Sequence, residues 1–136
     1  MKRALITGGS KGLGLELIKL LIDKNEFDIT NLSRSSCGIE QVNNIAVDLS
    51  MKNPMNEIAA HLSHQAPFDL VILNAGFNKS QPFLNLSDDD LDKMININLY
   101  APIALTHLLI KEKLLSPTAS FIFTSSLSHK SYGINW

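Results

Sequence analysis

A glycine-rich stretch near the amino end has residue types and a spacing that could bind a phosphate group. It reads Thr7-Gly8-Gly9-Ser10-Lys11-Gly12-Leu13-Gly14, and it follows the apolar residues 4–6. A turn from a strand into a helix directs the free N–H groups of the first helical turn toward one point, where their partial positive charge favours an anion. The chemistry predicted for this stretch is phosphate recognition by the backbone.

Three glycines would give this turn its shape. Gly8 can take the positive φ that a chain needs to leave a strand sharply, Gly12 has no Cβ to hold off a pyrophosphate, and Gly14 lets the helix lie close to the strand. The spacing G-x-x-x-G-x-G is neither the general dinucleotide fingerprint nor the P-loop. On this stretch alone, an ordinary glycine turn remains the alternative.

Strands and helices that alternate along the chain must position this turn. Apolar runs predict the strands, and apolar residues at helical spacing predict the helices between them. The predicted strands cover residues 3–7, 27–33, 45–47, 69–73 and 119–124, and the predicted helices cover residues 11–24, 53–67 and 88–110. This order predicts an α/β fold, with a single Rossmann-type domain over residues 1–136. Its doubly wound parallel sheet should have about five strands and helices on both faces.

The third predicted helix carries two local signals. Ser87 can cap its start, and three aspartates follow at the positive end of the helix, where a metal site is the weaker alternative because adjacent helical residues point in different directions. Pro102 removes one backbone donor, so we expect a bend near Asn98. We expect no metal site in this chain.

Several short polar motifs follow the predicted strands, and with them the sequence resembles the short-chain dehydrogenase/reductase family. The family's opening motif, T-G-x-x-x-G-x-G, is the glycine stretch. The motifs Asp48-Leu49, Asn74-Ala75-Gly76, Asn98 and Ser125-Ser126 then come in the family's order and at its approximate spacing. The resemblance implies a Rossmann fold and hydride transfer between a nicotinamide cofactor and a carbonyl or alcohol substrate, whose identity the sequence does not indicate.

The resemblance also implies which residues bind the cofactor. Asp48 would accept a hydrogen bond from the adenine amino group, although a cap for the following segment is the alternative, and residues 74–76 would line the ribose. The full expected set is Gly8, Ser10, Lys11, Gly12, Leu13, Gly14, Arg34, Asp48, Leu49, Asn74, Ala75 and Gly76.

Basic residues favour NADP(H) over NAD(H). A carboxylate at the end of the second strand would bind the ribose 2′-hydroxyl of NAD, whereas an arginine accommodates the 2′-phosphate. Here Arg34 occupies that place, the next acid is Glu40, and Lys11 adds a positive charge before the second glycine of the motif. A solvated surface charge is the alternative for either cation.

Asn98 and Ser126 match two members of the family's catalytic tetrad. The other two, Tyr-x-x-x-Lys, do not occur in these 136 residues, because Tyr132 has no lysine four positions later and Lys130 precedes it. We therefore expect the chain alone to be a weak or inactive form of an oxidoreductase. A non-catalytic NAD(P)-binding sensor or interaction module, and a disrupted gene product, are the alternatives.

The composition of the chain limits the classes of molecule that it is expected to bind. The net charge of −1 offers no electrostatic reason to expect nucleic acid, and no apolar run reaches the eighteen or so residues of a membrane span, so we expect a cytoplasmic protein. The single Cys37 is expected to be an incidental thiol. An apolar last strand and the helix before it predict self-association, as a twofold dimer.

Overall fold

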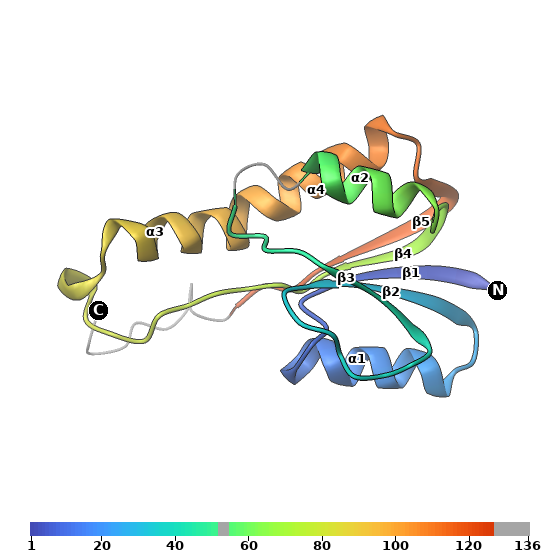
Figure 1. The fold of residues 1–136 in the computed structure, drawn as a ribbon, viewed down its shortest axis with the longest axis horizontal. Helices are drawn as coiled ribbons and strands as arrows, with labels where there is room; N and C mark the ends of the chain where they lie inside the picture. The colour runs from blue at the N-terminus through green and yellow to red at the C-terminus, as the bar shows by residue number, and fades with distance from the viewer. Residues whose placement is uncertain (52–54, 127–136) are drawn as a thin grey trace.

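The computed structural model describes residues 1–51 and 55–126 of the chain (Figure 1). The elements are β1 (Lys2–Thr7), α1 (Gly12–Asp23), β2 (Phe27–Ser33), β3 (Val42–Ala46), α2 (Met55–Ser63), β4 (Phe68–Leu73), the 3-10 turn η1 (Phe83–Asn85), α3 (Asp88–Ile95), the π-helical turn η2 (Asn96–Tyr100), α4 (Ala101–Lys111) and β5 (Leu115–Phe123).

The five strands form one parallel sheet in the order β3-β2-β1-β4-β5. Helix α1 covers one face, and α2 and α4 cover the other (Figure 1). Because β2 and β3 lie on one side of β1 whereas β4 and β5 lie on the other, the direction of winding reverses between β1 and β4. The predicted doubly wound sheet is confirmed, and this reversal is where such sheets bind ligands.

Successive side chains of the central strand β1 pack into two separate hydrophobic layers, one on each face of the sheet. In β1, Ala4 and Ile6 pack with Ile18 of α1, whereas Leu5 packs in the layer that contains Leu105 of α4. All five side chains are fully buried. A strand covered on both faces needs apolar residues at every position, which explains the uninterrupted apolar run near the amino end.

The third predicted helix is divided by a π-helical turn. Its start is as predicted, because the Ser87 hydroxyl accepts a hydrogen bond from the Asp90 N–H (3.2 Å) and the Asp90 carboxylate accepts one from the Ser87 N–H (3.2 Å). The irregularity expected near Asn98 is η2, and Pro102 follows it in the first turn of α4. The π turn therefore comes just before the residue that cannot donate a backbone hydrogen bond.

Two strands begin three or four residues earlier than predicted. β3 starts at Val42 instead of residue 45, because the polar Asn44 pairs with Asn31 of β2. β5 starts at Leu115 instead of residue 119 and contains Pro117, which lies where its register against β4 shifts. Proline is tolerated there because β5 is the last strand of the sheet within the described residues, and an edge strand can do without one N–H donor. The predicted helix start at residues 53 and 54 falls outside the described residues.

Strand β5 forms an edge of the sheet, in agreement with the sequence prediction, and its carboxyl half is apolar and exposed. Ile122 and Phe123 are 50% and 57% exposed, and the rings of Phe121 and Phe123 stack with centroids 6.0 Å apart.

Across the part of the chain that the structure describes, no helix has the length and apolarity needed to cross a membrane. The cytoplasmic location stays a prediction.

Candidate functional site

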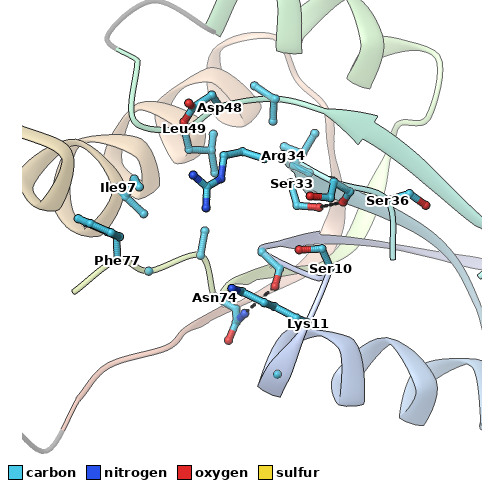
Figure 2. A pocket seen from close by; sticks show the side chains of 17 residues that line it. Ser10, Lys11, Ser33, Arg34, Ser36, Asp48, Leu49, Asn74, Phe77 and Ile97 are labelled. Carbon is cyan, nitrogen blue, oxygen red and sulfur yellow. Dashed lines mark hydrogen bonds between the residues drawn. The ribbon is translucent and has the colours of Figure 1, made fainter. Parts of the chain in front are cut away.

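A pocket of about 520 Å³ opens at the carboxyl edge of the sheet, where the ends of β1, β2 and β4 meet the loop after β3. Figure 2 shows the side chains that converge on it from these four segments. Most of the predicted cofactor-binding residues line it, namely Gly8, Ser10, Lys11, Gly12, Arg34, Asp48, Leu49, Asn74, Ala75 and Gly76.

The glycine turn is shaped as its residue types require. Gly8 has a φ of 71°, and a Cβ on it would lie 2.8 Å from Ala75 Cα, so only glycine lets β1 and β4 approach here. A Cβ on Gly14 would overlap the Gly8 carbonyl oxygen, which confirms the close packing of α1 on the turn. Gly12 has a φ of 57° and faces open space. The turn is closed on its protein side and open on its pocket side.

Thr7 joins the glycine turn to the end of β4. Its hydroxyl oxygen accepts hydrogen bonds from the N–H groups of Asn74 (3.0 Å) and Ala75 (2.9 Å). The Asn74 side-chain amide donates in return to the carbonyl oxygens of Thr7 (3.3 Å) and Gly8 (3.4 Å). These bonds satisfy the backbone where two strands leave the sheet, so this wall of the pocket is held by the protein itself.

Asp48 lies on the opposite wall, in the loop after β3. Its Oδ1 accepts hydrogen bonds from the Ser50 N–H (2.9 Å) and the Ser50 hydroxyl (2.7 Å). These bonds hold the pKa of Asp48 below its ordinary value, and the nearby Arg34 charge acts in the same direction. The carboxylate is therefore ionised at neutral pH, and its Oδ2 takes no part in the Ser50 turn. This local turn with Ser50 is what the structure shows for Asp48, and the start of the helix that it was expected to cap lies outside the described residues.

Two cations face the same pocket from different loops. Figure 2 shows the Arg34 guanidinium reaching into the space between Asp48 and Asn74, with Lys11 on the side of the glycine turn. Both residues are exposed. Both side chains therefore contribute positive charge to the lining of the pocket.

The π turn η2 connects two walls of the pocket. Asn96, which is buried, donates a hydrogen bond from its side-chain amide to the Ser50 carbonyl oxygen (2.7 Å). Asn98 holds the backbone of Phe77 on both sides, because it accepts from the Phe77 N–H (2.9 Å) and donates to the Phe77 carbonyl oxygen (2.7 Å). Asn98 thus positions the rim of the pocket without lining it.

Three other predicted residues lie off the pocket wall. Leu13 is 58% exposed, since it points away from the sheet in the first turn of α1. Gly14 lies behind the turn, against Gly8. Ser126 follows β5 and is exposed. The structure therefore gathers ten of the twelve cofactor-binding candidates in one pocket and places the two catalytic candidates, Asn98 and Ser126, outside its wall.

Sequence reasoning missed part of the lining. The added residues flank the predicted ones along the chain: Leu32, Ser33, Ser35, Ser36, Val47, Phe77 and Ile97. Most of them adjoin a predicted strand end, so the same rule about carboxyl ends could have found them. Ile97 could not be found in this way, because it comes from the π turn. In the described ranges, no group of three or more His, Cys, Asp or Glu side chains could hold a metal ion.

Comparisons with known proteins agree with this arrangement. The sequence profile described as short chain dehydrogenase matches residues 2–136. Ketoacyl reductase HetN of Nostoc sp. is 30% identical over 95% of this chain and 49% of its own length. Carbonyl reductase [NADPH] 2 of Sus scrofa is 28% identical over 96% of this chain and 55% of its own length.

Solved structures share the fold. A structure of 4-hydroxyisoleucine dehydrogenase complexed with NADH superimposes with a TM-score of 0.84 at 24% identity, covering 99% of this chain and 60% of the other. The chain spans about half the length of the curated relatives it matches. Because the family profile extends over nearly all 136 residues, the chain belongs to the short-chain dehydrogenase family.

Proposed function

We propose that this chain forms the NADP(H)-binding part of an oxidoreductase acting on a carbonyl or alcohol substrate. The observation that carries the proposal is the pocket, in which the open glycine turn, the ionised Asp48 and the cations Lys11 and Arg34 come together. A bound nicotinamide dinucleotide would supply or accept the hydride. The residues of this chain would bind and orient it.

The residues present fit the phosphates of such a cofactor. Among the described residues, no side chain caps the start of α1 at Lys11, so the first N–H groups of the helix are available to an anion there. A Cβ on Gly12 would meet nothing within 4 Å, so a ligand can approach the backbone closely there. On the opposite wall, Asp48 would accept a hydrogen bond from the adenine amino group.

The preference for NADP(H) is proposed from Lys11 and Arg34, whose positive charges would attract the 2′-phosphate. The similar proteins do not decide this choice, because the name of one contains NADPH and the structure of another contains NADH. Replacing Arg34 by alanine should weaken NADPH binding by about 1.5–3 kcal/mol, roughly tenfold to a hundredfold, and leave NADH binding nearly unchanged.

Calorimetric titration of the wild type and of Arg34→Ala with both cofactors tests the proposal. Lys24→Ala is the matched control, because Lys24 is an exposed cation at the end of α1 that lies away from the pocket. Equal affinities of the wild type for NADPH and NADH would contradict the preference. Absence of binding to either would contradict the cofactor site as a whole.

For the reaction, we propose that the Ser126 hydroxyl donates to the substrate oxygen as negative charge develops on it. Asn98 would keep the Phe77 backbone in place at the pocket rim. A positioned general acid contributes about 10²–10⁴-fold to rate, and these residues contain no Tyr-x-x-x-Lys to provide it. The 136-residue chain alone should therefore oxidise NADPH with ketones hardly above background.

A rate assay with a panel of ketones separates the possibilities. Robust turnover that Ser126→Ala abolishes would show that another residue or subunit supplies the proton. Tight binding without turnover would fit a weak form of the enzyme and equally the alternative of a non-catalytic cofactor-binding module. An assay in the presence of a full-length family member would then show whether this chain modulates turnover.

We also propose that the chain self-associates as a twofold dimer. Helix α4 and the turn before it expose Leu99, Ile103 and Ile110, each at about 60%. Strand β5, the next element along the chain, exposes Ile122 and Phe123. Uncovered apolar groups of this kind mark contact surfaces. Sedimentation at micromolar concentration should give a dimer, and Ile103→Glu should return it to a monomer. A wild-type monomer that binds no hydrophobic dye would contradict the proposal.

A further inference from the structure

Strand β2 contains a polar residue where the fold calls for an apolar one. Asn31 is 0% exposed and lies between the buried Thr30 and Leu32 in a strand covered on both faces. Burying an amide is unfavourable unless its donors and acceptor are hydrogen-bonded. An asparagine at this position therefore needs specific partners, and its partners indicate what it is for.

The partners of Asn31 lie in the glycine turn, at the end of β2 and in β3. Its Oδ1 accepts a hydrogen bond from the Gly9 N–H in the glycine turn (2.9 Å). Its Nδ2 donates to the Ser33 hydroxyl oxygen (2.9 Å) and to Asn44 Oδ1 in β3 (2.9 Å). One buried side chain thus links the turn after β1 to the end of β2 and to β3.

The second and third bonds continue to both ends of the turn that carries Arg34. The Ser33 hydroxyl donates onward to the Ser35 carbonyl oxygen (2.6 Å), and Asn44 Oδ1 also accepts from the Cys37 N–H (3.0 Å). Residues 33 and 35 flank Arg34 directly, and Cys37 closes the turn. The position of the arginine backbone is therefore tied to Asn31 from two directions.

The first bond fixes the glycine turn in the same way. A Cβ on Gly9 would lie 2.5 Å from Asn31 Oδ1, so the turn packs directly against this side chain. Lys11 is two residues further along the turn. Asn31 consequently lies behind both cation-bearing loops and has bonds to each.

We propose that Asn31 is a positioning residue that sets the separation of Lys11 and Arg34 and thereby the selectivity for the cofactor's 2′-phosphate. This inference rests on the proposed function, because the 2′-phosphate is the group that Lys11 and Arg34 are proposed to bind. Asn31 does not line the pocket, so it acts through the two loops.

The ratio of NADP⁺ to NAD⁺ affinity isolates this effect. The two cofactors differ only in the 2′-phosphate, so a general loss of folded protein or of glycine-turn order weakens both alike. A change in the spacing of Lys11 and Arg34 weakens NADP⁺ alone. Asn31→Leu, which keeps the size of the side chain but removes its three hydrogen bonds, should lower the ratio by about tenfold, the effect of one typical hydrogen bond.

Thr30→Val is the matched control. Thr30 is equally buried in the same strand, but strand alternation turns it to the opposite face of the sheet. It should leave the ratio unchanged, within about twofold. A wild-type ratio in Asn31→Leu, or an equal loss of ratio in Thr30→Val, would overturn the proposal.

Two further measurements keep the test decisive. If Asn31→Leu does not fold, Asn44→Ala replaces it, because Asn44 also lies off the pocket and holds only the Arg34 side, so the ratio should fall by a smaller factor. If the wild type shows no cofactor preference, the proposed function fails separately. The positioning role of Asn31 is then tested by amide hydrogen exchange of the protein without cofactor. Faster exchange of the Gly9 and Cys37 N–H groups in Asn31→Leu than in the wild type would support that role. Unchanged exchange of these two groups would overturn it.

Discussion

The two edges of the sheet differ in how well the chain covers them. On the side of β2 and β3, Ile29, Cys37 and Val42 are all at most 9% exposed. On the side of β5, Ile122 and Phe123 are at least half exposed. Helix α3 extends past the carboxyl edge of the sheet, with η1 at its far end (Figure 1). Most other exposed large hydrophobics also lie late in the chain: Phe83, Leu84, Ile95, Leu99, Tyr100, Ile103 and Ile110.

This difference in coverage divides the domain into two sides that hold different candidate functional residues. The well-covered side, which we call the nucleotide side, comprises β1, β2, β3 and α1 and holds the glycine turn, Arg34 and the Asn31 network. The other side, which we call the α3–β5 side, comprises α3, η2, α4 and β5 and leads to Asn98 and Ser126. We infer that the proposed cofactor binding depends on packing inside the chain, whereas the proposed reaction and self-association depend on surfaces that the described residues leave exposed.

The largest effect is expected in the core beneath α4. Leu105 is fully buried, so Leu105→Ala should lower the free energy of unfolding by about 2–5 kcal/mol. Ile103, two residues earlier on the same helix, is 60% exposed, and Ile103→Ala should change it by less than about 0.5 kcal/mol. Urea denaturation of the two variants measures this difference. Similar losses would show that the α3–β5 side is covered in solution.

A smaller loss is expected at the glycine turn, where it should be joined by a loss of binding. In Gly14→Ala the new Cβ would overlap the Gly8 carbonyl oxygen and lie 2.7 Å from Asn74 Nδ2. We expect a loss of about 1–3 kcal/mol in stability and weaker binding of both cofactors, because the turn must move.

Gly38→Ala is the matched control for the glycine turn. Gly38 has a φ of 74° and open space around it, so alanine should cost about 1–2 kcal/mol through backbone conformation alone. Denaturation and cofactor titration of both variants should show comparable stabilities but weaker binding only in Gly14→Ala. Unchanged binding in Gly14→Ala would break the link between nucleotide-side packing and the pocket.

The smallest effect concerns Asp90, a buried carboxylate near the start of α3, and it depends on pH. Asp90 accepts hydrogen bonds from Lys79 Nζ (2.8 Å) and the Ser87 hydroxyl (2.8 Å), and these lower its pKa to about 2. A carboxyl with a depressed pKa stabilises the fold above its unfolded pKa and loses that contribution as the pH falls toward the folded value. The stability difference between wild type and Asp90→Asn should be full above about pH 4 and shrink toward pH 2.

Asp89 gives the control for this experiment. It is the preceding residue and pairs with Lys93 (2.6 Å), but its side chain is 72% exposed, so Asp89→Asn should change stability much less. Thermal unfolding of the three proteins between about pH 2 and 7 would reveal the difference. An equal change in stability in Asp90→Asn and Asp89→Asn at every pH would mean that the bonds of Asp90 to Lys79 and Ser87 do not anchor α3.

Many features of the fold are determined by short segments of the sequence. The apolar run before Gly8 must be covered on both faces, and the ranges of β1, β2 and β4 follow from such runs to within a residue. Ser87 carries its own capping group, so the start of α3 is local as well. Gly14 tolerates no Cβ because of a neighbour six residues away. These features depend on backbone sterics and hydrophobic periodicity, which act over a few residues.

Other features arise only when distant segments pair. The early start of β3 depends on Asn44 meeting Asn31, and nothing in the local sequence distinguishes that asparagine from a loop residue. The pocket-lining role of Ile97 arises because the π turn brings it beside the end of β4. The exposure of Leu13 is settled by how α1 packs. Hydrogen bonds and burial between segments tens of residues apart have no signature in either segment alone, and the tertiary fold decides them.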